Sequence, residues 1–247
     1  MRIRRTMKPK NGPQSISDIL LKDIGINIDE LNSAVAAGRE FRKVSPSLRF
    51  NMTQKEAFMR LLRCYQIEVQ SRNRVFQLDQ SMVDVLMNIS EHMVQPTPKP
   101  GLNLCGLQGN GKSTMAKAIL RMIRDLNYSG HFKFMGEYFT VDTRSIKATD
   151  ICTLHKAEDC QSIRNLKQTS ILVIDDLGEE PKEVLVYGTP IYPVREVLES
   201  RYDSLKFTIL TSNLSPKDLP EHYGWRVVDR FKEMFHQVPF KGNSYRG

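Results

Sequence analysis

A glycine-rich loop between a short apolar run and an amphipathic segment constrains the fold of this chain more than any other feature. Residues 106–113 read GLQGNGKS and fit the pattern G-x-x-x-x-G-K-[ST], whose glycines let the backbone curl so that successive amides point inward at phosphate oxygens. The run before it, 101–106, is typical of a short strand, and residues 112–126 carry apolar side chains at helical spacing. A strand, this loop and a helix in that order predict a phosphate site at one edge of a sheet.

The residue types in this loop predict binding of a nucleoside triphosphate together with Mg²⁺. Lys112 can reach the β- and γ-phosphates, the Ser113 hydroxyl can ligate Mg²⁺, and the following helix adds the partial positive charge of its N-terminus. The loop residues expected to bind the nucleotide are Gly106, Gly109, Asn110, Gly111, Lys112, Ser113 and Thr114.

Strand-like and helical segments alternate through the second half of the chain. Residues 170–175 and 207–213 contain continuous apolar runs, as expected of strands that are buried on both faces of a sheet. Residues 193–205 between them read as a helix, and residues 131–141 contain strand-like stretches. The alternation predicts an α/β fold in which helices cover a parallel sheet.

Two adjacent acids follow the apolar run at 171–174 and supply a second part of the site. A parallel strand would deliver Asp175 and Asp176 to the carboxyl edge of the sheet, where ligands of α/β proteins bind. Burying two neighbouring carboxylates without a partner is unfavourable, and a metal ion offsets that penalty. We expect Asp175 to hold Mg²⁺ through water and Asp176 to position or polarise the attacking water. Glu179 and Glu180 are alternatives for the base.

Asn213 ends the next apolar run and is a third candidate. At the end of a neighbouring strand it can hydrogen-bond the γ-phosphate or the attacking water. An asparagine just before Ser215 and Pro216 is also a common way to begin a turn. Its position after Asp175 in the order of strands favours the functional interpretation.

The first 75 residues look helical and carry no motif that indicates a function. Residues 53–56, TQKE, form a capping box, and apolar residues follow on one helical face: Phe58, Leu61, Leu62, Tyr65 and Val69. Several arginines are expected on the same helix: Arg60, Arg63, Arg72 and Arg74. The apolar face is either core or a partner surface, and core is the commoner outcome.

Two further helices and a break are expected ahead of the phosphate loop. Residues 15–22 predict a short helix and residues 80–94 a longer one, whereas the prolines of 95–100 favour an extended entry into the next strand. We therefore predict a helical, partner-binding region over 1–75 and a nucleotide-binding domain over 76–247.

Composition excludes several classes of protein. Hydrophobic residues make up 40% of the chain and charged residues 26%, which are globular proportions. The longest aliphatic run, 171–174, is far shorter than the roughly 20 residues of a membrane span, so we expect no membrane partner. The basic start is followed by no apolar stretch, and the cysteines are scattered. We expect a cytoplasmic protein with reduced thiols.

The net charge of +8 is concentrated in residues 1–100, and residues 101–247 are nearly balanced. The first ten residues carry cations and no acid: Arg2, Arg4, Arg5, Lys8 and Lys10. A short basic arm can neutralise phosphates and raise affinity for nucleic acid, and it can equally be a solvated tail.

Several motifs together resemble the DnaC/IstB-like branch of the AAA+ ATPases. They are GLQGNGKST, ILVIDDLG, TILTSNLSP, YGWRVVDRFKEM and the closing SYRG. The resemblance covers residues 76–247, and its most specific part is TSNLSP followed by the YG-x-R segment. It implies an AAA+ P-loop NTPase core, and the short stretch 214–247 is similar to the truncated helical lid of the helicase-loader branch.

The resemblance also implies roles for single residues. Lys112 and Ser113 match the Walker A lysine and hydroxyl, and Asp175 and Asp176 match the Walker B pair, whose second place is often Glu in other AAA+ proteins. Asn213 matches sensor 1.

Three arginines complete this set. Arg230 matches the arginine finger that reaches the nucleotide of a neighbouring subunit, and Arg226 lies four residues earlier on the same face of the expected helix. Arg246 matches the sensor 2 arginine. A planar, permanently charged guanidinium suits the charge that develops on phosphate, so Arg226 and Arg246 are expected to bind the nucleotide.

The function implied is that of an ATP-hydrolysing helicase loader in DNA replication. Its partners would be a replicative helicase, single-stranded DNA and further copies of the chain in an oligomer or spiral, with ATP and Mg²⁺ bound. An IstB-type transposition helper, which binds duplex DNA and a transposase, is the alternative. Because Asp176 replaces the commoner Glu, a nucleotide-gated adaptor that hardly hydrolyses ATP is a third reading.

Overall fold

The elements alternate along the chain as the sequence predicts. The computed structural model describes residues 50–95, 99–128, 133–134, 137–138, 141–215 and 217–241. The helices are α3 (Gln54–Gln70), α4 (Gln80–Val94), α5 (Lys112–Tyr128), α6 (Ala148–Lys156), α7 (Cys160–Gln168), α8 (Pro193–Asp203), α9 (Asp218–Tyr223) and α10 (Trp225–Met234). The strands are β1 (Gly101–Gly106), β2 (Lys133–Phe134), β3 (Glu137–Tyr138), β4 (Thr143–Lys147), β5 (Ile171–Leu177), β6 (Val184–Val186), β7 (Thr189–Ile191), β8 (Phe207–Ser212) and β9 (Phe235–Phe240).

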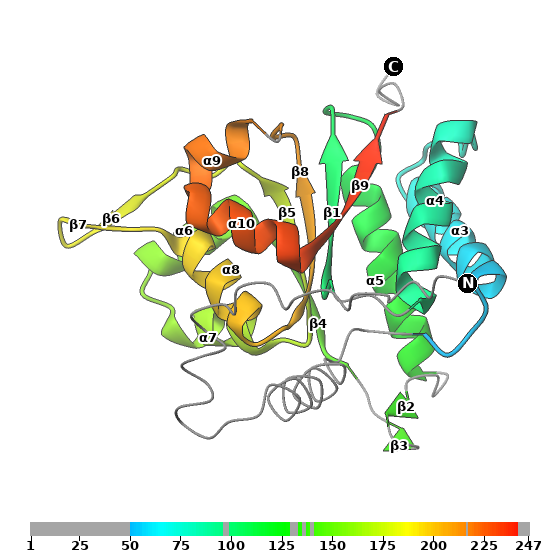
Figure 1. The fold of residues 1–247 in the computed structure, drawn as a ribbon, viewed down its shortest axis with the longest axis horizontal. Coiled ribbons are helices and arrows are strands. Elements are labelled where there is room, and N and C mark those ends of the chain that lie inside the picture. The colour runs from blue at the N-terminus through cyan, green and yellow to red at the C-terminus, as the bar shows by residue number, and fades with distance from the viewer. Residues whose placement is uncertain are drawn as a thin grey trace, which may run out of the picture. The chain divides into compact units, whose positions relative to one another are not determined.

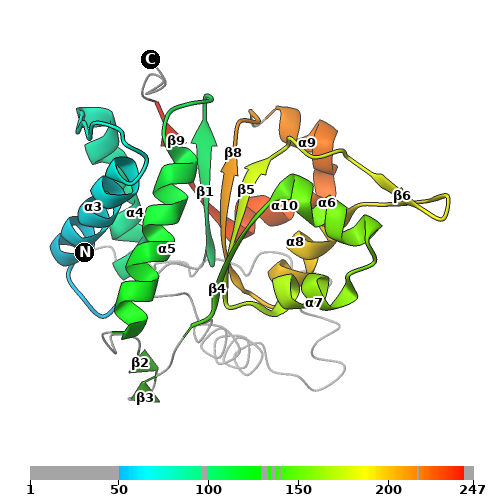
Figure 2. The same cartoon turned by 180° about the vertical axis from the view of Figure 1, so that it is seen from behind.

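A five-stranded sheet with the order β4-β5-β8-β1-β9 forms the centre of the fold (Figure 1). Each neighbouring pair in it is parallel. Helices α3, α4 and α5 cover one face, and α6, α7, α8 and α10 cover the other (Figures 1 and 2). The predicted α/β fold, a parallel sheet between helical layers, is confirmed.

Alternate residues of the buried strands pack into two hydrophobic cores, one on each face of the sheet. Ile171 and Val173 of β5 pack with α3, α4 and α5, whereas Leu172 and Ile174 pack with the opposite helices. This alternation follows from the pleat of a strand, in which successive side chains point to opposite faces. The continuous apolar run is therefore needed to supply both layers.

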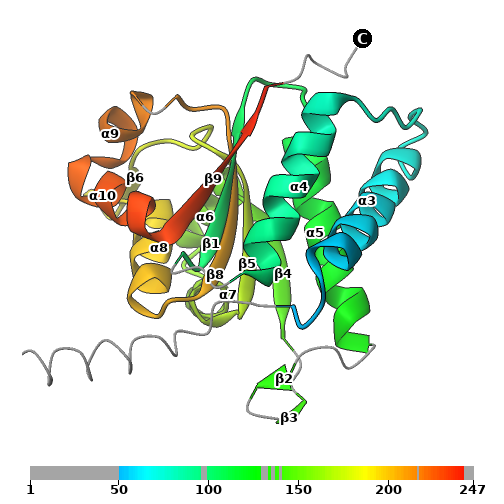
Figure 3. The ribbon, with the colours of Figure 1, turned by 45° about the vertical axis from the view of Figure 1, so that its right-hand side comes forward.

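Helix α3 begins with the expected capping box. The Thr53 amide donates to Glu56 Oε2 at 2.8 Å, and the Glu56 amide donates to Thr53 Oγ1 at 3.2 Å. Leu61 and Tyr65 on its apolar face are buried in the core that α3 shares with α4 and α5 (Figure 3). For these residues the apolar face is core rather than a partner surface.

The described residues all belong to one compact unit within 46–247. The short helix expected at 15–22 lies outside the described residues. Helix α3 shares the unit of the sheet, and the functional division between 1–75 and 76–247 stays a prediction. Within the described ranges, no helix is both long and apolar enough to cross a membrane.

A buried arginine joins α8 to the sheet. The Arg201 guanidinium is fully buried and donates to the carbonyl oxygens of Leu166 at 2.8 Å, Thr169 at 2.7 Å and Phe207 at 2.7 Å. Its Nε donates to Thr208 Oγ1 at 2.9 Å. Burial lowers the pKa of Arg201 to about 9, so the side chain is still charged at neutral pH. Arg201 thereby fixes the end of α7 and the start of β8.

Candidate functional site

The glycine-rich loop connects β1 to α5 at the carboxyl edge of the sheet. Gly106, Gly109 and Gly111 have φ angles of 149°, 87° and 92°, a region that L side chains rarely adopt. A Cβ atom at Gly106 would also lie 2.5 Å from the carbonyl oxygen of Phe240, where β9 ends. The motif glycines are therefore required by the backbone of the loop and by its contact with β9.

The Lys112 ammonium lies over the loop itself. Its Nζ donates to the carbonyl oxygens of Gly106 and Leu107, both at 2.7 Å, and to Asn110 Oδ1 at 3.1 Å. Only 7% of the residue is exposed, so the charge is held in place by oxygen acceptors and not by bulk water. A bound phosphate would offer this ammonium further acceptors at the same position.

Asn110 ties the loop to the neighbouring strand. Its Nδ2 donates to the carbonyl oxygen of Phe240 at 3.0 Å, and only 1% of the residue is exposed. Both ends of its amide are thus bound within the protein, one by Phe240 and the other by Lys112. In this structure the side chain of Asn110 therefore supports the loop.

The two acids of β5 are held differently, and a threonine of β8 connects them. Thr211 Oγ1 donates to Asp175 Oδ1 at 2.5 Å and accepts from the Asp176 amide at 2.9 Å. The β5–β8 register shifts between Ile174 and Leu177, and Asp176 has a φ of 57°. The backbone thereby turns Asp176 toward the loop while Asp175 is oriented by Thr211.

Asp176 has an altered acidity. Burial, followed by the nearby charge of Asp175, raises the pKa of the Asp176 carboxyl above its ordinary value. Glu179 acts in the same direction, and Lys147 and Lys112 act against it. A carboxylate with a raised pKa is a stronger proton acceptor than an ordinary aspartate.

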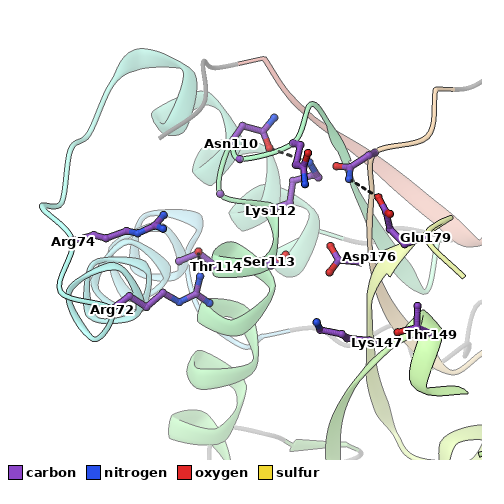
Figure 4. A pocket seen from close by; sticks show the side chains of 14 residues that line it. Arg72, Arg74, Asn110, Lys112, Ser113, Thr114, Lys147, Thr149, Asp176 and Glu179 are labelled. Carbon is purple, nitrogen blue, oxygen red and sulfur yellow. Dashed lines mark hydrogen bonds between the residues drawn. The ribbon is translucent and has the colours of Figure 1, made fainter. Parts of the chain in front are cut away.

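These elements surround a cavity of about 340 Å³ (Figure 4). The residues expected from the sequence that line it are Gly109, Asn110, Gly111, Lys112, Ser113, Thr114, Asp176 and Asn213. Two further expected residues do not line the cavity: Gly106, at the end of β1, and Asp175, within β5. The structure thus brings most of the expected loop and strand-end residues to one place.

Sequence reasoning missed other residues that line the same cavity. They are Arg72, Arg74, Gln108, Lys147 and Thr149. Lys147 ends β4 directly opposite Asp175, so a lysine at a strand end was the available signal. Thr211, which contacts Asp175 and Asp176 from outside the lining, could also have been suspected, because it is a polar residue within an apolar run. Arg72 and Arg74, expected on α3, lie after its end at Gln70, and no local pattern marks them as part of a site.

The two glutamates considered as alternative bases separate clearly. Glu179 lines the cavity and accepts from Asn213 Nδ2 at 3.3 Å. Glu180 is buried outside the cavity lining, where its carboxylate accepts from the Gly178 amide at 2.7 Å and from the Tyr223 hydroxyl. Of the two, only Glu179 faces the position where a nucleotide would lie.

The expected arginines of α10 lie apart from this cavity. The Arg230 Nη1 is 3.3 Å from Glu199 Oε1, and its guanidinium lies 5.0 Å from the ring centroid of Tyr202. Arg226 is exposed, and neither arginine is among the described cavity residues. Arg246 lies outside the described residues. The site therefore holds no α10 arginine from its own chain.

Comparisons with solved structures agree with this fold. A crystal structure of the DnaC helicase loader is 24% identical, with a TM-score of 0.52, and the match covers 72% of this chain and 98% of that one. A crystal structure of DnaI is 19% identical, with a TM-score of 0.53, covering 73% of this chain and 93% of that one. No family model matches the sequence, and no curated protein matches it. The chain therefore has the α/β P-loop NTPase fold of the DnaC and DnaI structures.

Proposed function

We propose that the chain is an AAA+ ATPase that binds ATP with Mg²⁺ in the cavity beside the phosphate loop. One observation supports this most strongly: the loop residues 109–113, with Lys112 among them, line a single cavity together with Asp176 and Asn213. A polyphosphate needs positive groups along its length, and its hydrolysis needs a carboxylate and a hydrogen-bonding side chain at the terminal phosphate. The cavity supplies both.

The donor set fits Mg²⁺. Hydroxyl and carboxylate oxygens are hard ligands of the kind that this ion prefers. Ser113 lines the cavity and would ligate the ion directly, whereas Asp175 lies outside the lining and would hold it through water. The Thr211 bond orients the Asp175 carboxylate for that role. When bound, Mg²⁺ would neutralise charge on the phosphate oxygens.

Asp176 would accept a proton from the attacking water. Its place in the cavity lining and its raised pKa both suit this task. Asn213 would position the γ-phosphate or the water, and its bond to Glu179 orients its amide. Glu179 is the remaining alternative for the base.

The test of nucleotide binding is Lys112→Ala in the full chain. We expect a loss of ATP affinity of about tenfold to 100-fold by isothermal titration, because the charged hydrogen bonds to phosphate disappear. Lys117→Ala is the matched control, since Lys117 is an exposed lysine of the same helix. Equal ATP affinity in Lys112→Ala and wild type would reject the site.

We further propose that this ATPase acts in the cytoplasm as a helicase loader in DNA replication. In an oligomer or spiral, Arg230 of one subunit would complete the site of the next, consistent with its position outside its own cavity. The resemblance of the motifs and the shared fold with the DnaC helicase loader support this role. Single-stranded DNA and a replicative helicase would be the partners.

Binding assays with the full chain separate this role from transposition. We expect retention of a purified replicative helicase on the immobilised chain, and tighter binding of a single-stranded than of a duplex oligonucleotide in the presence of ATP. Duplex preference together with retention of a transposase would favour the IstB-type helper instead. ATP binding without turnover would favour a nucleotide-gated adaptor.

A further inference from the structure

Two arginines that follow α3 form one wall of the phosphate-loop cavity (Figure 4). The Arg72 Nη1 donates to Thr114 Oγ1 at 2.9 Å, and Thr114 lies in the first turn of α5, directly after Ser113. Arg74 lines the same cavity. Both side chains are exposed, so they can reach a ligand that enters from solvent.

The backbone after α3 fixes where these side chains project. The Arg72 amide donates to the Val69 carbonyl at 3.2 Å, and the Asn73 amide donates to the Gln70 carbonyl at 2.9 Å. Asn73 has a φ of 54°, a left-handed conformation that ends the helical turn between the two arginines. Because α3 shares a core with α5, this turn is held beside the start of α5.

Arg72 and Arg74 differ from the neighbouring Arg121 of α5 in having no ion-pair partner among the described residues. Arg121 forms an ion pair of 2.7 Å with Glu68. Within the described ranges, by contrast, no carboxylate lies within ion-pair distance of Arg72 or Arg74, which therefore direct uncompensated positive charge at the cavity.

The opposite wall of the cavity determines which end of a nucleotide these arginines would meet. Asp176 and Glu179 lie on the far side of the loop from Arg72 and Arg74 (Figure 4). The hydrolysed terminal phosphate must face Asp176, so the rest of the nucleotide extends from the loop away from that wall. Thr114, which Arg72 contacts, lies on that other side.

We propose that Arg72 and Arg74 bind the nucleotide at its α-phosphate and ribose end. This inference rests on the proposed nucleotide site. A guanidinium offers several N–H donors in a planar fork that matches phosphate oxygens. Because both arginines follow α3, nucleotide binding would also connect α3 to the first turn of α5.

The test compares ATP and ADP affinities of the full chain by isothermal titration. The Arg72→Ala/Arg74→Ala double variant should lose about tenfold in affinity or more, and equally for both nucleotides, because both carry the α-phosphate. Asn213→Ala, at the terminal-phosphate end, should weaken ATP more than ADP. Arg63→Ala is the matched control: it removes an exposed arginine of α3 that does not line the cavity and should change neither affinity.

Two further variants keep the test independent of folding. Arg74→Ala alone removes no hydrogen bond that the structure shows, and Arg72→Lys keeps the charge without the planar fork. Each variant should lower the affinity for both nucleotides by a smaller factor than the double variant does. Unchanged affinity in the double variant, or a loss confined to ATP, would overturn the inference. If Lys112→Ala weakens binding while the double variant does not, the inference fails and the nucleotide site stands.

Discussion

Arg201 and Arg230, in the layer of α8 and α10, are bound by groups near them in that layer and in β8, whereas Arg72 and Arg74, after α3, face the phosphate-loop cavity. The first two arginines are therefore bound within the protein on one face of the sheet, whereas Arg72 and Arg74 on the other face line the cavity. An arginine whose donors are already bound stabilises its surroundings or must exchange partners to act. An arginine that lines a cavity without an ion-pair partner is available to an anion.

The largest expected effect concerns Arg230. Arg230→Ala should lower ATP turnover of the proposed assembly by about 1000-fold, because in that assembly a guanidinium from the neighbouring subunit would stabilise the transferring phosphate. The ATP affinity of the dispersed chain should not change, since Arg230 does not line its own cavity. Steady-state phosphate release and isothermal titration measure the two quantities, with the exposed Lys232→Ala on α10 as control.

Mixed assemblies test whether that site is shared. Arg230→Ala subunits retain Asp176, and Asp176→Asn subunits retain Arg230, so a mixture contains some sites with both groups. Turnover should partly recover on mixing. If both variants are inactive alone and every mixture stays inactive, the shared-site geometry is wrong, and the contrast between the two arginine groups loses its functional meaning.

Asp176 gives the next effect. Asp176→Asn should reduce turnover by about 100-fold with little change in ATP affinity, because the amide cannot accept the proton. In the wild type kcat/KM should fall as the pH falls through the pKa of Asp176, and this loss should begin at a higher pH than for an ordinary aspartate, since the pKa is raised. Greater loss in Glu179→Gln than in Asp176→Asn would transfer the role of base to Glu179.

The bound Arg201 and the cavity-lining Arg72 should also differ in how much each contributes to the stability of the fold. Arg201→Met should lower the free energy of unfolding by at least about 3 kcal/mol, because it leaves three carbonyl oxygens and a threonine hydroxyl buried without their donor. Arg72→Ala should change it by less than about 0.5 kcal/mol, as for other exposed residues. Urea unfolding measures both, with the exposed Arg164→Met as control. Similar losses of unfolding free energy in Arg201→Met and Arg72→Ala would contradict the distinction between a bound arginine and one that lines the cavity.

The smallest effect is expected at Glu199, whose Oε1 accepts from Arg195 Nε at 3.4 Å and lies 3.3 Å from Arg230 Nη1 in an ion pair. Glu199→Gln should release Arg230 and raise turnover of the assembly about twofold to fivefold, the range of a partly exposed ion pair. Glu196→Gln on the same helix is the control, since Glu196 pairs with Lys167. A fall in turnover would mean that Glu199 positions Arg230 instead of restraining it.

The central strands could be predicted and the edge strands could not. β1, β5 and β8 are buried on both faces, so their apolar runs stand out in the sequence. β4 and β9 lie at the edges of the sheet, where one face or one side needs no apolar partner, and β9 even accommodates Pro239. No apolar run marks either edge strand, and the sequence pattern predicts no strand at 235–240.

The candidate site divides in a similar way. Lys112, Ser113 and Thr114 are consecutive, so a local motif identifies them. Arg72 is 42 residues from Thr114 in the chain and meets it only because α3 packs on α5. Thr211 contacts both Asp175 and Asp176 because β8 pairs with β5.

The phosphate loop, the buried strands in their order along the chain and the acids at the end of β5 can be predicted from the residues alone. They depend on local backbone freedom and on runs of apolar residues. Which charges line the cavity and which are bound elsewhere depends on how the helices pack. Arg72 and Arg74 reach the cavity through the packing of α3, while Glu199 and Tyr202 hold Arg230 through the proximity of α8 and α10. Such contacts join residues that are far apart in the chain. The partner of a charged side chain therefore cannot be predicted from its sequence neighbours.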